Sequence, residues 1–97
     1  MLPNIFLYAI ACREKKVTAA CYNLGINMMQ AEDYAGAAAY LKIACDVKEF
    51  ENSGKACYNA GYVAGKAGDD KKKKAYWKKA CARGVQRGCD DAKALDD

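Results

Sequence analysis

The chain has 97 residues, of which 53% are hydrophobic and only 10% aromatic, and it carries a formal net charge of +4. This length allows one domain, and abundant alanine with few β-branched residues favours packed helices over strands. No apolar stretch approaches the length of a membrane-spanning helix, so we expect no membrane insertion.

The first expected element covers residues 3–15. Pro3 suits the first turn of a helix, and the apolar run from Ile5 to Cys12 continues it. The run is short and no basic residue precedes it, so it does not have the pattern of a secretory leader. We interpret this segment as a half-repeat that corresponds to the second helix of a pair.

The middle of the chain contains an internal repeat. Residues 20–25 (ACYNLG) recur as residues 56–61 (ACYNAG), and residues 40–45 (YLKIAC) recur as residues 76–81 (YWKKAC). Two separate blocks share one offset of 36 residues, which is the signature of a repeat architecture. The expected repeats are residues 18–46 and 54–82.

Each repeat is predicted to be a pair of helices. Apolar residues recur at three- and four-residue steps over 18–30 and 54–66, which indicates the first helices. Asp33 and Asp69 are suitable N-caps for second helices over about 34–46 and 70–82. Residues 86–95 resemble the first helix of a further pair, a second half-repeat. The prediction is a single all-α domain over 1–97 with about six helices.

Six cysteines in so short a chain favour a disulfide framework and an oxidising compartment. Zinc binding is the weaker alternative, because the chain has no histidine and no CxxC pair, and free buried thiols are another. We therefore expect no metal and no cofactor. A periplasmic or secreted location follows, with the mitochondrial intermembrane space as the alternative.

The cysteines occupy equivalent places at every junction between helix pairs. One ends each second helix and one lies near the start of the following first helix. Fifteen pairings are possible in principle. Only one set applies the same local chain reversal at each junction, and it joins Cys12 to Cys21, Cys45 to Cys57 and Cys81 to Cys89.

These residues also resemble a known repeat family. The run Tyr22-Asn23-Leu24-Gly25, followed by Asp33-Tyr34, Ala37, Tyr40 and Ala44, is similar to a tetratricopeptide repeat in type and spacing. The cysteine-bridged junction resembles the Sel1-like branch, and specifically the Helicobacter cysteine-rich proteins. Lys73 departs from the pattern, since a small residue is usual there, and the usual closing proline is absent from both copies. The resemblance implies a right-handed α-solenoid of antiparallel helix pairs.

In that family layout the first helices line a concave binding surface. Carried over position by position, it implies a binding face, here called the tyrosine face, made of Tyr22, Asn23, Ile26, Met29, Gln30, Lys55, Tyr58, Asn59, Tyr62 and Lys66. Tyrosine and methionine offer apolar contact area, and asparagine offers hydrogen bonds to a backbone. The alternative is that Tyr22 and Tyr58 pack between helices. Tyr40, Tyr76 and Trp77 are assigned to the core.

Other chemistry finds less support. The cysteine-rich family is associated with β-lactam binding or hydrolysis, but Ser53 is the only serine, has no histidine to activate it and lacks the SxxK spacing, so we interpret it as a turn residue. Pairs of aspartates such as Asp69-Asp70 and Asp90-Asp91 suit helix starts. Four consecutive lysines, residues 71–74, point in different directions on a helix and indicate a solvated surface instead of a nucleic-acid site.

Three functional hypotheses follow. The first is a protein-interaction module that binds a peptide or protein partner and is not an enzyme. The second is a β-lactam-binding or hydrolysing protein. The third is an immunity protein, an inhibitor or an assembly factor for one partner.

Overall fold

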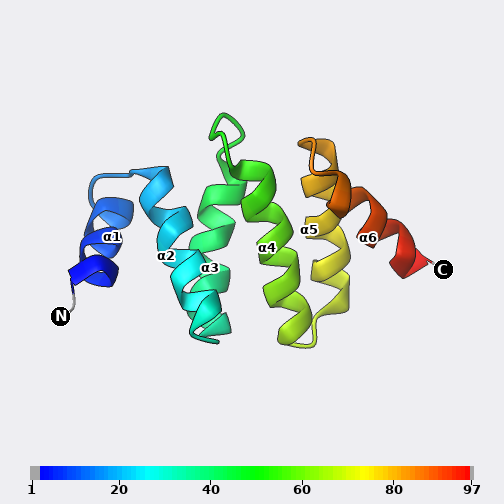
Figure 1. The fold of residues 1–97 in the computed structure, drawn as a ribbon, viewed down its shortest axis with the longest axis horizontal. Coiled ribbons are helices and arrows are strands. Elements are labelled where there is room, and N and C mark those ends of the chain that lie inside the picture. The colour runs from blue at the N-terminus through cyan, green and yellow to red at the C-terminus, as the bar shows by residue number, and fades with distance from the viewer. Residues whose placement is uncertain (1–2, 97) are drawn as a thin grey trace.

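A computed structural model describes residues 3–96, with side chains from Phe6 onward. These residues form six helices and no strand (Figure 1), namely α1 Pro3–Arg13, α2 Thr18–Gln30, α3 Tyr34–Asp46, α4 Ser53–Lys66, α5 Asp70–Ala82 and α6 Gln86–Asp96. The prediction of an all-helical chain is confirmed. Met1, Leu2 and Asp97, which the predicted domain includes, lie outside the described residues.

The helices lie side by side in chain order and alternate in direction, so that the molecule is an elongated row (Figure 1). Each helix packs on the next one in the sequence, and α2 also touches α4. The molecule measures 45 × 27 × 15 Å. With this arrangement each helix buries its apolar side against its sequence neighbours, as a linear stack of helix pairs requires.

The turns inside the two repeats are built alike. Asp33 and Asp69 accept hydrogen bonds from the backbone N–H groups of Gly36 and Lys72, three residues further on, as N-cap residues do. The residue before each cap has a positive φ, 63° at Glu32 and 84° at Gly68. Only the second repeat has the residue type that adopts this conformation without strain.

Close helix contact depends on one glycine in each repeat. A Cβ atom on Gly25 would lie 2.7 Å from the Cγ atom of Leu41, and one on Gly61 would lie 2.6 Å from the Cδ1 atom of Trp77. Leu41 and Trp77 stand 36 residues apart, as the two glycines do. The same crossing of first and second helix therefore occurs twice, with a different large side chain resting on the glycine.

The core is a chain of small clusters along the row, and cysteines belong to two of them. Cys12 and Cys21 lie with Leu24 and Tyr40, whereas Cys45 and Cys57 lie with Ala44, Ala56 and Ala80. Three disulfides join Cys12–Cys21, Cys45–Cys57 and Cys81–Cys89, with Cα atoms 4.6–4.8 Å apart. These are the three pairs expected from the spacing, and they staple α1 to α2, α3 to α4 and α5 to α6.

Arg83 ties the middle disulfide to the end of α5. Its guanidinium donates to the backbone carbonyl of Cys45, in the last turn of α3, and lies 3.2 Å from the Sγ atom of Cys57. A cation at a helix C-terminus also interacts favourably with the helix dipole. Arg83 therefore connects the C-terminal ends of the second helices α3 and α5 beside this disulfide.

Candidate functional site

None of the ten residues of the tyrosine face is buried. Five are exposed, namely Asn23, Gln30, Lys55, Tyr62 and Lys66, and the other five are half-buried. They lie on α2 and α4, which touch each other in the row. The face is therefore accessible along both first helices, but the environments of its two equivalent tyrosines differ.

Tyr22 packs against the junction between α3 and α4. Its ring meets Phe50 edge-on, with ring centroids 5.8 Å apart, and it lies against two of the buried clusters. Burial raises the pKa of its phenol. Tyr22 therefore contributes mainly to packing, with one edge at the surface.

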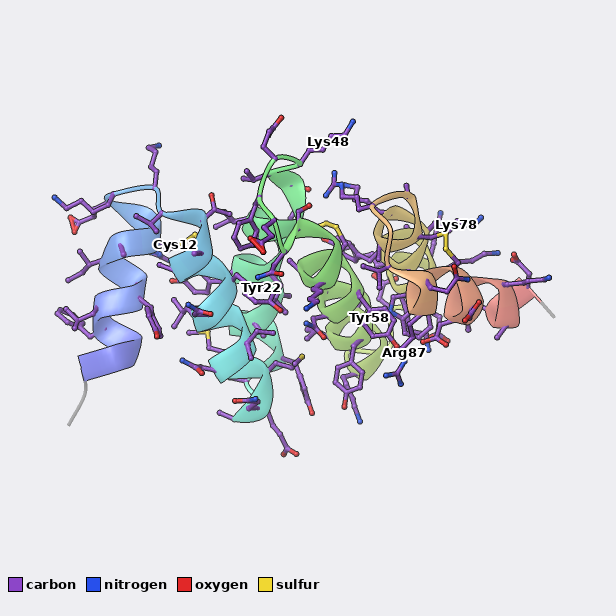
Figure 2. All side chains as sticks on the ribbon, turned by 45° about the horizontal axis from the view of Figure 1, so that its top comes forward. Cys12, Tyr22, Lys48, Tyr58, Lys78 and Arg87 are labelled. Carbon is purple, nitrogen blue, oxygen red and sulfur yellow. A yellow bond between two sulfur atoms is a disulfide. The ribbon has the colours of Figure 1, made fainter. Side chains whose placement is uncertain are left out.

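Tyr58 is held by three helices. It lies on α4, stacks on Trp77 of α5 with ring centroids 5.4 Å apart, and donates a 2.5 Å hydrogen bond to Asp91 of α6. Arg87 of α6 lies 5.5 Å from the centre of the same ring (Figure 2). Burial, together with the hydrogen bond to Asp91, raises the pKa of Tyr58 to about 12. Tyr58 thus joins the last three helices.

Asp91 corrects an interpretation made from the sequence. Its position in a pair of aspartates near an expected helix start was attributed to the helix dipole. In the structure α6 begins at Gln86, so Asp91 lies in its second turn. Its carboxylate accepts a hydrogen bond from the hydroxyl of Tyr58 and lies 3.7 Å from the Nε atom of Arg87. Its role is a contact between helices, which no local pattern could show.

A hollow opens beside Tyr62, between α4 and α5. We call it the lysine–tryptophan hollow, and it has a volume of about 330 Å³ and is lined by Tyr62, Gly65, Lys66, Lys73 and Trp77. The ammonium of Lys66 lies 5.3 Å from the centre of the Tyr62 ring, and that of Lys73 lies 5.2 Å from the centre of the Trp77 ring. Two cations therefore rest on two aromatic walls at the end of the tyrosine face.

Gly65 explains how Lys73 fits where the family pattern has a small residue. A Cβ atom on Gly65 would lie 2.6 Å from the Cδ atom of Lys73. The absence of a side chain at 65 leaves space for the lysine to lie over Trp77. Lys73 and Trp77 were not placed on the binding face from the sequence, and Trp77 is half-buried at its edge instead of fully in the core.

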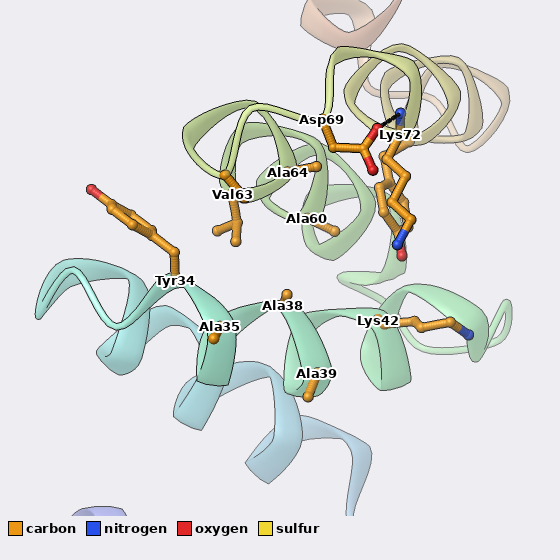
Figure 3. A pocket seen from close by; sticks show the side chains of 12 residues that line it. Tyr34, Ala35, Ala38, Ala39, Lys42, Ala60, Val63, Ala64, Asp69 and Lys72 are labelled. Atoms are coloured by element: carbon orange, nitrogen blue, oxygen red, sulfur yellow. Dashed lines mark hydrogen bonds between the residues drawn. The ribbon is translucent and has the colours of Figure 1, made fainter.

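A second hollow lies on another side of α4. This alanine hollow has a volume of about 340 Å³ and is lined by Tyr34, Ala35, Ala38, Ala39, Lys42, Ala60, Val63, Ala64, Ala67, Asp69, Lys72 and Tyr76 (Figure 3). None of the ten predicted face residues lines it. Three residues of this hollow, Ala35, Ala38 and Ala39, have the spacing of one helix face, and this pattern in the sequence could have indicated the hollow. They are exposed, although alanines with this spacing normally face a core.

Ser53 begins α4 instead of lying in the preceding turn. Its side chain is buried, with 3% of its surface exposed, and its hydroxyl donates to the backbone carbonyl of Lys48 at 3.4 Å. A nucleophile must reach a substrate and have a base within hydrogen-bonding distance. The burial of Ser53 argues against such a role.

The lysines of α5, both in the run 71–74 and beyond it, are partly used for internal contacts. Lys74 pairs with Asp96 of α6, and Lys79 lies 3.4 Å from Asp46 of α3. Lys42 bonds the same Asp46 at 2.7 Å, and these two lysines hold the pKa of Asp46 below its usual value, with Lys42 the main cause. Lys71 and Lys72 are exposed. Some of these lysines therefore pair with aspartates of neighbouring helices, while others are exposed to solvent.

Within residues 3–96 no helix is long and apolar enough to cross a membrane. The same residues hold no group of three histidine, cysteine, aspartate or glutamate side chains arranged for a metal ion. The three disulfides indicate that the chain folds in an oxidising compartment. No protein-family model, no curated protein and no solved structure matches this chain.

Proposed function

We propose that the protein is a disulfide-stapled, right-handed α-solenoid of the tetratricopeptide and Sel1-like kind, which binds a peptide or protein partner along the tyrosine face. The observation that carries the proposal is the exposure of this face. All ten of its residues reach the surface, while Ala20, Leu24, Ala56 and Ala60 on the same two helices are buried.

The chemistry of the face suits a peptide. Tyr62 is 41% exposed and offers apolar area with a polar tip, as aromatic residues at interfaces do. Asn23, Gln30 and Asn59 offer amide groups that can donate to and accept from a peptide backbone. The face therefore combines apolar contact with hydrogen bonds that do not depend on the partner's side chains.

The disulfides support binding by keeping the face rigid. One joins α2 to α1 and another joins α4 to α3, so each first helix is restrained against the helix before it when a partner arrives. Such preorganisation reduces the entropy lost on binding. We place the protein in the periplasm or outside the cell, with the mitochondrial intermembrane space as the alternative.

An inhibitor, an immunity protein or an assembly factor would use the same surface, because these functions differ in the partner and not in the physics of the contact. The β-lactam hypothesis has weaker support, since Ser53 is buried and bonded to the backbone. We therefore retain partner binding as the function and propose no catalytic activity.

The test is a selection of peptides from a random library on the oxidised protein, followed by mapping of the bound peptide through amide chemical shifts. We expect the shifts to concentrate on α2 and α4, around Asn23, Asn59 and Tyr62. Asn59→Ala should weaken binding, whereas Ala39→Ser, in the alanine hollow, should not. Shifts confined to the alanine hollow would overturn the assignment of the tyrosine face.

A further inference from the structure

We propose that the lysine–tryptophan hollow is a subsite for a carboxylate of an acidic peptide, which binds between the ammonium groups of Lys66 and Lys73. The inference rests on the proposed function, because it names the chemistry of the partner at one end of the tyrosine face. Three observations support it: neither lysine has a close anionic partner among the described residues, a hollow lies beside them, and the first repeat has no charged residue at the equivalent positions.

The ammonium of Lys73 is poorly compensated. Only 23% of its side chain is exposed, yet its one ion-pair contact within the described residues is Asp70, at 3.7 Å and with 79% of that side chain exposed. A long contact to a solvated carboxylate contributes little. A half-buried cation without a close anion is the condition in which an incoming carboxylate binds favourably.

Lys66 supplies the second cation from the neighbouring helix. It lies in the last turn of α4 and makes no ion pair with any described residue. The ammonium of Lys66 lies over the ring of Tyr62, and that of Lys73 lies over the ring of Trp77. These contacts hold both ammonium groups near the hollow. A carboxylate between them would accept charge-assisted hydrogen bonds beside two apolar walls.

Glycine at residue 65 lets Lys73 lie along the wall of the hollow, because a Cβ atom there would lie 2.6 Å from the Cδ atom of Lys73. The volume of the hollow, about 330 Å³, exceeds that of one acidic side chain, and part of this space opens to solvent. The equivalent residue of the first repeat is Met29, which packs on the buried cluster of Ala37 and Leu41. The first repeat thus has a long side chain at the place where the second repeat has a glycine beneath Lys73.

The comparison extends to charge. Counting back 36 residues from Tyr62, Lys66, Lys73 and Trp77 gives Ile26, Gln30, Ala37 and Leu41, none of which is charged. The first repeat therefore has three apolar residues and one neutral amide where the second repeat holds two cations and two aromatic rings. Since both repeats make the same helix crossing, stability alone does not require the cations.

A peptide is favoured over a nucleic acid by the shape of the surroundings. The hollow is small and walled by rings, and it continues into the tyrosine face, where Asn59 and Tyr62 suit a peptide backbone. A polyanionic strand would need a longer row of cations along its path. The residues beside Lys66 on α4 offer amides and rings instead.

Trp77 provides a direct test, because it is the only tryptophan of the chain and forms a wall of the hollow. We would titrate the oxidised protein with a blocked tetraglutamate peptide at low salt and follow tryptophan fluorescence. We expect a saturable change that a blocked tetraglutamine peptide does not give. Lys73→Gln and Lys66→Gln should each weaken binding about tenfold or more, the loss of one charge-assisted hydrogen bond.

Two variants separate the site from general attraction. Gly65→Met introduces the residue of the first repeat and keeps the net charge, and it should remove the binding because its side chain would displace Lys73 from the wall of the hollow. The double variant Lys71→Gln with Lys78→Gln removes two other α5 charges and should change affinity only about as much as screening by salt does. Circular dichroism and melting curves establish that each variant is folded.

Three results would overturn the inference. They are an absence of any saturable change at millimolar peptide, an equal loss of binding in the Lys71 and Lys78 double variant, and an equal response to inorganic phosphate alone. If tetraglutamate does not bind, or binds equally well without Lys66 and Lys73, while library peptides still map to the tyrosine face, the subsite is wrong and the proposed function stands. If library peptides map to the alanine hollow, the proposed function itself fails.

Discussion

The helix pair α2–α3 and the helix pair α4–α5 have the same framework and different surfaces. Both have an aspartate N-cap, a positive-φ residue before it, and a glycine beneath a large side chain. In the first pair that side chain is Leu41, which is fully buried, whereas in the second it is Trp77, which is half-buried and stacks on Tyr58. The framework is repeated for stability, and the changes between copies identify where a specific role can lie.

The largest expected effect concerns Leu41 and Trp77. Leu41→Ala should lower the free energy of unfolding by about 4 kcal/mol, because the cavity it leaves is completely enclosed. Trp77→Ala should cost about 3 kcal/mol, since part of its ring already faces solvent. Urea unfolding of the oxidised proteins measures both, with exposed Ile43→Ala as a control of about 0.5 kcal/mol. A larger cost at Trp77 would mean that its stack on Tyr58 outweighs burial.

The next effect compares two disulfides. Replacing Cys45 and Cys57 together by alanine should cost about 3 kcal/mol through the entropy of the unfolded chain. The Cys81–Cys89 bond closes a shorter loop and should cost slightly less. Cys45 and Cys57 are fully buried while Cys81 and Cys89 are half-buried, so a mild reductant should open Cys81–Cys89 first.

Alkylation after timed exposure to the reductant, followed by mass spectrometry, gives the order of opening. Reduction of the buried Cys45–Cys57 bond before the outer one would show that the middle of the row opens more easily than its end. In that case the packing of Arg83 on this disulfide does not protect it.

A smaller effect should come from the turn inside each repeat. Glu32 has a φ of 63°, a conformation that costs a non-glycine residue about 1 kcal/mol. Glu32→Gly should therefore stabilise the protein by a comparable amount, and Gly68→Ala in the second repeat should destabilise it by about 1 kcal/mol. Thermal melts of the two variants should shift in opposite directions, and shifts of the same sign would contradict the equivalence of the two turns.

The smallest expected effect concerns the ionisation of Tyr22 and Tyr58. The pKa of both is raised, and that of Tyr58 reaches about 12 from a usual value of 10.0. Since the folded state favours the neutral phenol, the contribution of Tyr58 to stability is complete below pH 10 and is lost as the pH rises through about 12.

Absorbance at the tyrosinate band follows this ionisation. Tyr58→Phe should remove the last ionisation step, and Asp91→Asn should move that step to lower pH while leaving Tyr22 unchanged. If ionisation near pH 12 survives in Tyr58→Phe, that step belongs to another tyrosine. The contact of Tyr58 with Asp91 would then be weaker than the geometry indicates.

The sequence predicted those features that depend on neighbouring residues. The caps at Asp33 and Asp69 and the bounds of the inner helices follow from local spacing, and the structure places them within one residue of the prediction. The cysteine pairs also agree, because each joins consecutive helices. Features that depend on how a helix meets its second neighbour were missed, such as the contact of Tyr58 with Asp91 and the alanine hollow. Tyr58 and Asp91 are 33 residues apart, the alanine hollow is lined from Tyr34 to Tyr76, and no repeated pattern links these residues.

The disulfides also bear on how the chain acquires its native connectivity. The three closed loops follow one another and none encloses another. In every pair, the second cysteine bonds with the cysteine immediately before it in the chain. A chain that enters an oxidising compartment from its N-terminus therefore meets the correct partner first at each step. Order of arrival is then sufficient to produce the native bonds, without reshuffling of earlier ones.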